Sequence, residues 1–511
     1  MSFPTYRRRQ GRFSPDSHPK FDYGTRIIYP ANQAPTLFDD SNLAENMIGT
    51  TPLGLLTLLL LGLISALWTT TASAADLEGK RIDALAQPYL ESETVVGMSI
   101  GVIQGDQTIV RGYGQLAADD PRKPDEKTIY EIGSVTKTFT GLLLADAVVK
   151  GEVELDMPIR IAFTSAIDVP QLEKEAPIRL VHLATHTSGL PRMPDNINPA
   201  DPNNPYADYD EALLLDFLQK HRLQKSPGQA IAYSNLGAGL LGTLLAAQLQ
   251  TKYATLLENR IAKPLAMHDT RIALTDSQQS RLAPPLYGDG TPGHAWDFDA
   301  LAGAGAIRSD VSDLLKYAQA YLDPPQGKLG EAIEIAWKRR QQPIKKSDFA
   351  MGLGWHIAHD GQTRFHSGQT GGYHSAIFIN RQLNVAVVVL ANTATTEIDA
   401  LAEQLVRLAA GAEEEPREFP QYAKVSAADV KRLAGQYQLA PGFVFAVTAE
   451  GTKLMVGLTG QTTHPVYPNS ETEWRYKVVD ATLTFQLDES GKCTAVELLQ
   501  NGVRQTANRI K

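Results

Sequence analysis

Residues 130–150, YEIGSVTKTFTGLLLADAVVK, are the stretch around which the rest of this chain of 511 residues is organised. Ser134 follows Gly133 at the start of a long apolar run, and this pattern predicts a buried helix over 134–150. Lys137 lies three residues after Ser134, so the two side chains share one face of that helix. The stretch therefore predicts a helix that holds a lysine amine next to a serine hydroxyl.

Strands are predicted on both sides of this helix, with further helices between them. Two apolar runs around Gly105 and Asp106 predict a β-hairpin over 95–114, and a helix is predicted before it at 77–92. The other predicted helices are 177–186, 209–221, 235–249, 252–262, 309–322 and 396–410, and the other predicted strands are 351–359, 363–367, 373–380 and 385–392. Alternating strand–helix units are absent. The pattern predicts an α+β fold, in which both ends form one antiparallel sheet flanked by helices around an inserted all-α lobe.

The pattern changes near the C-terminus. Residues 413–424 are charged, contain prolines and lack periodicity, which indicates a linker. Beyond them, residues 425–511 contain alternating apolar runs separated by turns, which predicts a small antiparallel β-barrel or sandwich. We therefore expect a main domain over 75–412 and a separate small domain. The charged linker suggests few contacts between them, so we expect the main domain to fold without the small one.

The N-terminal 74 residues predict export. Residues 53–68, LGLLTLLLLGLISALW, carry no charge. The run suits the apolar region of a secretory signal better than a bilayer span, which needs about 20 residues. Small residues follow at 72–74, so we expect a signal at 47–74 and a periplasmic or secreted product. Residues 1–46 are then a disordered tail or precede the true start, and an uncleaved membrane anchor is the alternative.

The composition excludes several classes of function. The net charge is −9 and the acidic residues are spread along the chain, which argues against nucleic-acid binding because phosphates need a concentrated basic face. One cysteine, Cys493, excludes an internal disulfide and a cysteine-rich metal site. His182 and His186 have the spacing of a metal pair but no acidic or cysteine partner nearby, so we interpret them as packing residues. No metal and no organic cofactor are expected.

A second serine can be set aside. Ser99 lies in GMSIG, residues 97–101, which matches the G-x-S-x-G pattern of many hydrolases. That pattern requires a strand, a sharp turn and a helix, whereas Ser99 lies in a strand-like run that leads into a hairpin. We interpret it as an ordinary strand residue.

Ser134 and Lys137 have the residue types that nucleophilic catalysis needs. A serine hydroxyl is a weak nucleophile until a base takes its proton. A lysine in a dry environment beside other cationic or phenolic groups has a lowered pKa and can accept that proton. The helix N-terminus adds positive potential where an oxyanion would form. On this pattern alone, a helix N-cap followed by a surface lysine is the open alternative.

Two further segments carry candidate residues. In IAYSNLG, residues 231–237, Tyr233 could relay protons and Asn235 could hold a substrate amide. In RFHSGQTGGYHS, residues 364–375, a strand ends in a glycine-rich continuation that lets a ligand approach the backbone. The open alternatives are a helix N-cap with a surface tyrosine and a glycine-rich turn with an exposed histidine.

The three segments, in this order and with these spacings, resemble the penicillin-recognising serine hydrolases. The likeness is greatest to the class C β-lactamase branch, which includes D-Ala-D-Ala carboxypeptidases, D-aminopeptidases and family VIII esterases. The segments that carry it are GSVTKTFTG (133–141), LVHLATHTSGLP (180–191), SPGQAIAYSNLG (226–237), IAKPLAMHDT (261–270), GAGAIRSDVSDLLKYAQ (303–319) and HSGQTGGYHSAIFIN (366–380). The resemblance covers about 80–410 and implies a β-lactamase/transpeptidase-like fold. The C-terminal region is similar to the lipocalin-like barrel of many such proteins.

The resemblance implies a role for each candidate residue. The implied catalytic residues are Ser134 as acylated nucleophile, Lys137 as its proton acceptor and Tyr233 as proton shuttle. The implied substrate-binding residues are Asn235, which holds a substrate amide, and His366, Ser367, Gly368 and Gln369 on the substrate-facing strand. The backbone N–H groups of Ser134 and Gln369 would form the oxyanion hole.

The chain departs from class C β-lactamases at one position, where His-Ser-Gly replaces Lys-Thr-Gly. A histidine with an ordinary pKa near 6.5 is mostly neutral at pH 7, so His366 offers a substrate carboxylate less positive potential than lysine. This puts efficient β-lactam hydrolysis in doubt. It also predicts that activity on anionic substrates rises as the pH falls from about 8 to about 6.

We therefore expect an exported serine hydrolase that acts through an acyl-enzyme. Its substrate would be a small molecule or peptide: a β-lactam, a D-amino-acid peptide or a small ester. One alternative is a β-lactam-binding or muropeptide-binding protein that is acylated without turnover. A second is a ligand-binding barrel beside an inactive hydrolase.

Overall fold

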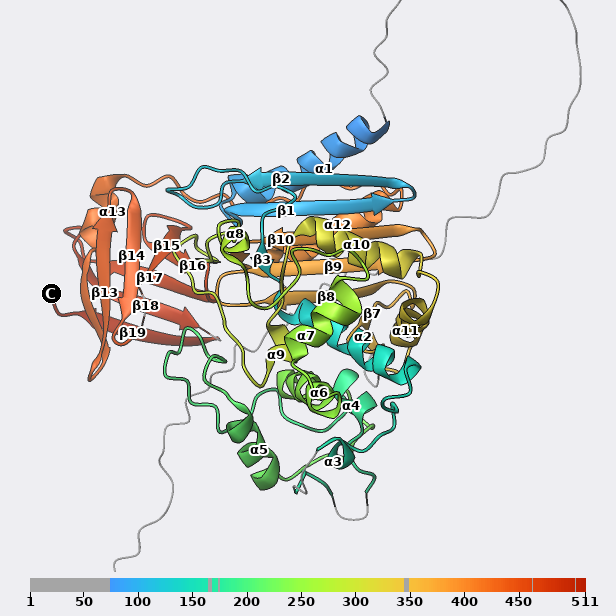
Figure 1. Cartoon of the computed structure of the whole chain (residues 1–511). Helices are drawn as coiled ribbons and strands as arrows, with labels where there is room; N and C mark the ends of the chain where they lie inside the picture. The colour runs from blue at the N-terminus through green and yellow to red at the C-terminus, as the bar shows by residue number, and fades with distance from the viewer. Residues whose placement is uncertain (1–73, 164–167, 173–174, 344–348, 462, 501) are drawn as a thin grey trace, which may run out of the picture. The chain divides into compact units, whose positions relative to one another are not determined.

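The computed structural model describes residues 74–511 except 164–167, 173–174, 344–348, 462 and 501 (Figure 1). The tail expected at 1–46 and almost all of the signal expected at 47–74 lie outside the described residues. None of the helices in the described part of the chain combines the length and the hydropathy needed to cross a membrane.

A seven-stranded antiparallel sheet, in the order β2-β1-β10-β9-β8-β7-β6, joins the two ends of the main body. Its strands are β1 (Gly97–Gln104), β2 (Gln107–Gly114), β6 (Ala350–Met351), β7 (His356–Ile357), β8 (Arg364–Gln369), β9 (His374–Asn380) and β10 (Val385–Ala391). Figure 1 shows the blue hairpin of β1 and β2 beside the orange strands β10 and β9. In the register of β1 and β10, Met98 lies opposite Ala391. This pairing confirms the predicted α+β fold. The single strand predicted at 351–359 is instead two short strands around a turn, in which Gly354 has a φ of +73°.

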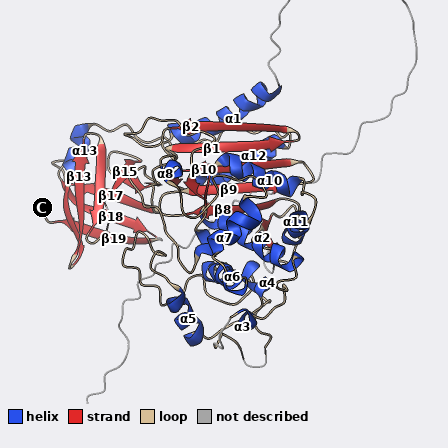
Figure 2. Cartoon of the chain, in the orientation of Figure 1, coloured by secondary structure: helices blue, strands red, loops and turns tan. Residues whose placement is uncertain are grey.

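Helices cover both faces of this sheet (Figure 2). Strand β10 reads VAVVVLA, a continuous apolar run of the kind that is buried on both sides. Its residues alternate, because Val387 packs with α1 (Ala74–Glu91) and α12 (Glu397–Ala409), whereas Val388 packs with the larger cluster that contains α10 (Val311–Leu322). The sheet is therefore the middle layer of the main body.

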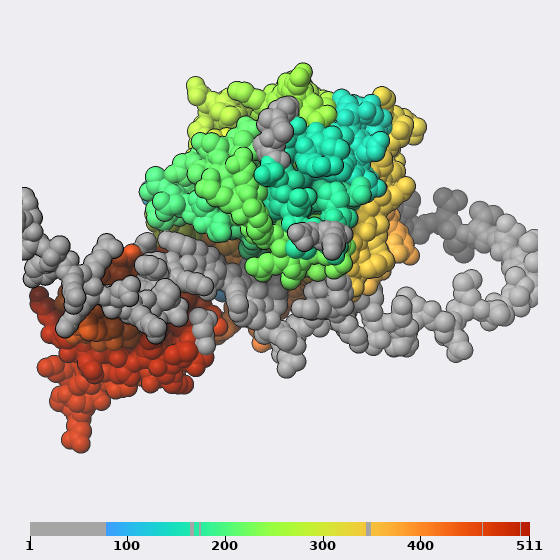
Figure 3. All heavy atoms as spheres, turned by 90° about the horizontal axis from the view of Figure 1, so that it is seen from below, coloured from blue at the N-terminus to red at the C-terminus, as the bar shows by residue number. Residues whose placement is uncertain are grey.

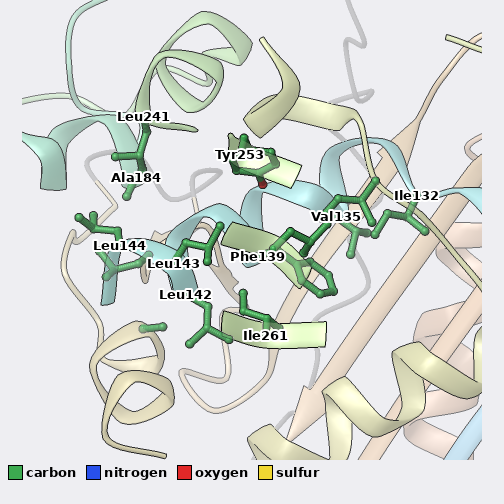
Figure 4. Close-up of a cluster of buried hydrophobic side chains, with 14 of the residues drawn as sticks. Ile132, Val135, Phe139, Leu142, Leu143, Leu144, Ala184, Leu241, Tyr253 and Ile261 are labelled. Carbon is green, nitrogen blue, oxygen red and sulfur yellow. The ribbon is translucent and has the colours of Figure 1, made fainter. Parts of the chain in front are cut away.

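The helical lobe surrounds α2 (Thr136–Val149), which is buried along most of its length. Figure 4 shows Phe139 and Leu142 of α2 packed in one cluster with Tyr253 and Ile261, and Figure 3 shows the cyan and green outer surface of this lobe. Its other helices are α3 (Ile159–Ala162), α4 (Leu180–Ala184), α5 (Glu211–Lys220), α6 (Asn235–Gln248), α7 (Tyr253–Leu257), the π-helical η2 (Glu258–Ala262) and α9 (Ala302–Gly305). A further short helix of the main body is α8 (Asp276–Gln279). The lobe therefore buries α2 and what it carries.

Two helical predictions need correction. The helix predicted at 177–186 is only α4, because His186 has a φ of +56° that an α-helix cannot continue through. The helix α11 (Lys328–Trp337) was not predicted, although its buried Ala332, Ile333, Ala336 and Trp337 have helical spacing. Short paired segments complete the body: β3 (Tyr130–Glu131) with β5 (Arg308–Ser309), and β4 (Leu286–Tyr287) with β11 (Thr393–Ala394).

The C-terminal region is a closed eight-stranded barrel, as predicted. Its strands are β12 (Gly435–Ala440), β13 (Phe443–Glu450), β14 (Lys453–Leu458), β15 (His464–Pro468), β16 (Glu473–Tyr476), β17 (Ala481–Leu487), β18 (Cys493–Gln500) and β19 (Val503–Arg509), preceded by an unpredicted helix α13 (Ala427–Leu433). Side chains such as Tyr437, Trp474 and Phe485 form its core. Alternating apolar residues, which face inward, produce this core.

The segment before the barrel makes more contacts than its composition suggested. No helix or strand forms over 413–424, all of which is described. The Phe419 ring nevertheless packs edge-on against Tyr89 of α1 at 4.8 Å, and Arg417 pairs with Glu397 of α12 at 2.6 Å. One aromatic contact and one ion pair therefore anchor this segment to the main body.

Candidate active site

Ser134 lies in a short 3₁₀ turn, η1 (Gly133–Val135), that leads into α2. It is not a helix N-cap, because Val135 occupies that position and no side chain caps the helix. Lys137 follows in the first turn of α2 and is only 2% exposed. Its Nζ lies 2.8 Å from Ser134 Oγ and donates to the backbone oxygen of Ala304, in α9, at 2.7 Å. The alternative of an N-cap with a surface lysine is therefore excluded.

The environment of Lys137 favours its neutral form. Burial lowers its pKa well below the ordinary value, and the positive charge of Arg192 lowers it further. Among the described residues, no carboxylate forms an ion pair with this amine. A neutral amine beside a hydroxyl is a proton acceptor, so the pair has the chemistry of a nucleophile and its base.

Tyr233 lies next to this pair, just before α6. The N-cap of α6 is Ser234, whose Oγ accepts from the Gly237 N–H at 2.8 Å, so Tyr233 is not the cap. Its ring centroid lies 5.0 Å from Lys137 Nζ. Burial raises the pKa of Tyr233, while Ser134 and the Arg192 charge oppose that shift. The phenol is therefore protonated at neutral pH and can pass a proton between neighbours.

Asn235 is the first residue of α6 and offers a free acceptor. Its Nδ2 donates to the Tyr206 hydroxyl at 3.1 Å. Its Oδ1 is buried and has no hydrogen-bond partner among the described residues. A buried amide oxygen without a partner is costly unless a ligand supplies a donor, so this atom is suited to bind an N–H group.

Strand β8 carries the third predicted segment past the serine. A Cβ on Gly368 would lie 2.1 Å from the Ile132 oxygen and 2.7 Å from the Ser134 nitrogen, so only glycine allows this approach. Ser367 is partly exposed on the same strand. The structure therefore brings Gly368 against Ser134, with Ser367 as its neighbour on the strand.

Gln369 presents its backbone N–H on the serine side of β8. Thr370 N–H donates to the Tyr373 oxygen, so the next pair, Gln369 with His374, is a non-hydrogen-bonded pair of the antiparallel ladder. Its N–H consequently points away from β9. Gly133 packs against it, because a Cβ there would lie 2.7 Å from the Gln369 nitrogen. Two backbone N–H groups, those of Ser134 and Gln369, are thus gathered beside the hydroxyl.

His366 differs from its predicted environment. It lies within strand β8, as the resemblance implied, but it is only 1% exposed, so the alternative of a turn with an exposed histidine is excluded. Its Nδ1 lies 2.6 Å from the Ser367 oxygen, and its Nε2 is buried without a partner among the described residues. Burial lowers the pKa of His366 well below its ordinary value, and His356 and Lys137 add to this. His366 is therefore neutral between pH 8 and pH 6, and the expected rise of activity over that range loses its basis.

The residues set aside in the sequence are structural. His186 accepts the Ser234 N–H at its Nδ1 (3.2 Å) and packs against the Tyr233 ring, so it anchors the segment before α6. His182 accepts the Arg179 N–H at its Nδ1, also at 3.2 Å. Ser99 is buried in β1 and bonds to the Asp125 backbone oxygen at 2.8 Å. No cluster of three or more metal-ligating side chains occurs within the residues that the structure describes.

Three contributors were missed from the sequence. Ala304 acts through its backbone oxygen, which no side-chain pattern reveals, although it lies within the quoted segment 303–319. Tyr206 directly follows the proline-rich and asparagine-rich loop 193–205, where no apolar periodicity indicates a buried residue. Arg192 directly follows 180–191 and lies over the Tyr233 ring at 5.1 Å.

The chain is similar to proteins of known family. The Beta-lactamase family model matches residues 82–411. A beta-lactamase of Yersinia enterocolitica is 30% identical over 277 residues, which are 53% of this chain and 66% of that protein. The D-alanyl-D-alanine-carboxypeptidase/endopeptidase AmpH of Escherichia coli K12 is 29% identical over 285 residues, or 54% of this chain and 72% of that protein. This chain thus spans about two thirds of the length of these relatives.

Solved structures show the same fold. A beta-lactamase/D-alanine carboxypeptidase from Yersinia pestis, complexed with citrate, aligns with a TM-score of 0.59 and 26% identity, over 66% of this chain and 99% of that one. A mutant class C beta-lactamase aligns with a TM-score of 0.56 and 22% identity, over 65% of this chain and 98% of that one. The main body therefore has the β-lactamase/transpeptidase-like α+β fold.

Proposed function

The chain belongs to the Beta-lactamase family of serine hydrolases, and we propose that it hydrolyses an amide or ester through an acyl-enzyme formed on Ser134. One observation carries this proposal: the amine of Lys137, buried and without a carboxylate partner among the described residues, lies 2.8 Å from Ser134 Oγ. That arrangement supplies a base to a hydroxyl that is otherwise unreactive.

The acylation step uses four residues of the site. Lys137 takes the proton of Ser134 while Oγ bonds to the substrate carbonyl carbon. The carbonyl oxygen becomes an oxyanion, which the backbone N–H groups of Ser134 and Gln369 stabilise. The bond to the leaving group then breaks, and Tyr233 gives that group a proton while it takes one from the Lys137 ammonium. The step leaves an ester on Ser134 and a neutral amine on Lys137.

Deacylation reverses these roles with water. A water molecule adds to the ester carbonyl, and its proton passes to Lys137 through Tyr233. The oxyanion is held by the same two N–H groups. Ser134 Oγ then leaves and recovers a proton from Lys137, which regenerates the enzyme.

We propose a β-lactam, a D-amino-acid peptide or a small ester as substrate, because the relatives are named beta-lactamase and carboxypeptidase. The free Oδ1 of Asn235 would hold an N–H of that substrate. Residues 75–412 would form the hydrolase domain and 425–511 a barrel domain, with 413–424 as the segment between them. The apolar run at 53–68 supports export to the periplasm or the medium, with membrane attachment only if the signal is uncleaved.

The test is a substrate panel with detection of the covalent intermediate. Purified protein is incubated with nitrocefin, with p-nitrophenyl butyrate and with a peptide that ends in D-Ala-D-Ala. After proteolysis, mass spectrometry measures the mass of the enzyme fragment that contains Ser134. Steady turnover of at least one substrate, with an acyl adduct on Ser134, supports the proposal. A stoichiometric burst without turnover would favour the binding protein, and turnover without an adduct on Ser134 would refute the assignment.

A further inference from the structure

We propose that Arg192 binds an anionic group on the acyl half of the substrate. The inference rests on the proposed function and names the substrate class that the site prefers. A guanidinium binds a carboxylate through two parallel hydrogen bonds, so Arg192 is suited to a substrate whose acyl chain ends in a carboxylate.

The position of Arg192 is fixed by its backbone. Its carbonyl oxygen accepts the N–H groups of Asn235 (3.0 Å) and Leu236 (3.2 Å), at the first turn of α6. Its guanidinium carbon lies 5.1 Å from the centroid of the Tyr233 ring, the same ring that Lys137 Nζ approaches at 5.0 Å. The charged group is therefore held beside two residues of the site, although the side chain itself is exposed.

Several half-buried arginines of the main body have acidic partners, and among the described residues Arg192 has none. Arg308 pairs with the buried carboxylate of Glu131 at 3.0 Å, and Arg260 pairs with Asp146 at 3.0 Å. Within the described part of the chain, the Arg192 guanidinium forms no ion pair and no side-chain hydrogen bond. In a chain with a net charge of −9, an arginine at the site without an acidic partner has its hydrogen-bond donors available to a ligand.

The other groups at the site do not supply this charge. Lys137 is buried and bonded to Ser134 and Ala304, and His366 is buried with one nitrogen bonded to Ser367. Arg192 therefore contributes the permanent positive charge beside Tyr233.

The neighbour of Arg192 indicates which half of the substrate would carry the anionic group. Asn235, whose free Oδ1 would accept an N–H of the acyl half, is bonded through its backbone to Arg192. His366 belongs to β8, a different element, and its ring centroid lies 6.2 Å from that of Tyr233. An anion at Arg192 therefore lies beside Asn235 and the substrate N–H that its Oδ1 would accept.

The experiment uses two esters with one leaving group. Mono-p-nitrophenyl glutarate carries a carboxylate on its acyl chain, and the p-nitrophenyl methyl ester of glutaric acid is its neutral counterpart. We expect the full-length enzyme to prefer the anionic ester about tenfold in kcat/KM, and we expect Arg192→Gln to remove most of this preference. Arg192→Lys should keep part of it, and added salt should weaken it. The ratio of the two esters is the measurement, because an effect of Arg192 on Lys137 cancels in it.

Arg222→Gln is the matched control. Arg222 is also exposed, and within the described ranges its guanidinium bonds only to the backbone oxygens of Gln219 and His221, so this variant changes the net charge equally away from the site. It should leave the ratio unchanged.

The contrary outcomes are distinct. Equal losses on both esters in Arg192→Gln would show that Arg192 acts on the chemistry, and no preference in the wild type would show that it binds no anion; either overturns the inference. A larger loss on nitrocefin, whose carboxylate lies on the leaving half, would also overturn it. If neither ester is turned over and Ser134 is not acylated by them or by the other panel substrates, the proposed function itself fails.

Discussion

Lys137 at the start of α2 and His366 in β8 show two results of one physical effect. Both can carry a positive charge, both are almost fully buried, at 2% and 1% exposed, and burial lowers the pKa of each well below its ordinary value. For the lysine, which touches Ser134 Oγ and the Ala304 oxygen, loss of charge creates a base. For the histidine, whose Nε2 has no partner among the described residues, it removes a cation that a substrate carboxylate could use. Burial therefore makes the Lys137 amine a proton acceptor beside Ser134 and leaves His366 without a charge.

The largest effects should come from the α2 side. Ser134→Ala should lower kcat by on the order of 10⁴-fold or more while leaving the fold intact, because it removes only a hydroxyl. Lys137→Ala should be nearly as severe, and the double variant should be little worse than either, because the two groups act as one unit. Turnover of a p-nitrophenyl ester measures this, and circular dichroism checks the fold. If Lys137→Ala kept a tenth of the activity, another group would be the base.

Gly133 joins the two sides, so Gly133→Ala should disturb both. Its φ is +47°, and an added Cβ would lie 2.7 Å from the Gln369 nitrogen. We expect the free energy of unfolding to fall by about 1–3 kcal/mol from backbone strain and kcat to fall by roughly 10²-fold, because the two oxyanion donors would separate. Urea denaturation and ester turnover measure the two effects. As a control, Gly151→Ala has the same backbone strain (φ +74°) with nothing within 4 Å, so it should lose stability but not activity.

The buried histidines predict a loss of stability in acid. His186 and His366 have a pKa well below the ordinary value in the folded protein, and that of His356 is lowered to about 4. Below pH 6.5 the unfolded chain takes up protons that the folded chain does not, so stability decreases as the pH falls. By pH 5 each histidine that stays neutral in the folded protein should lower the free energy of unfolding by up to about 2 kcal/mol.

Urea titrations at pH 7 and pH 5 measure this slope. His356→Phe, which places a ring between the same aromatic neighbours, should reduce it while removing only one of the three groups. An unchanged slope in this variant would show that His356 is charged in the folded protein.

The smallest effect is expected for substrate preference against pH. Because His366 stays neutral, the ratio of kcat/KM for a substrate with a leaving-half carboxylate, such as nitrocefin, to that for a neutral ester should change less than about twofold between pH 8 and pH 6. Both substrates should lose activity together as Lys137 becomes protonated. A ratio that rises about tenfold towards pH 6, and that is flat in His366→Asn, would restore the prediction made from the sequence.

The fold and most of the candidate site residues can be predicted from the sequence. The hairpin at 95–114, the strands at 373–380 and 385–392 and the helix at 235–249 are present within a few residues, because their apolar periodicity and turns are strong. The barrel was equally clear from its alternation. Weak local signals failed: the helix at 177–186 ended early at a residue with positive φ, and α11 was overlooked.

The sequence alone determined which residue types are available. It has a serine three positions before a lysine, a tyrosine and an asparagine at the start of a helix, and glycines at 133 and 368, where η1 and β8 meet. These follow from local spacing, which a chain carries before it folds. Only the tertiary structure decided their charges and partners. Whether Lys137 and His366 are neutral depends on how much water neighbouring elements remove. The Ala304 oxygen and the Arg192 guanidinium come from segments far away in the chain. Desolvation is a property of the whole packed body, so no local pattern contains it.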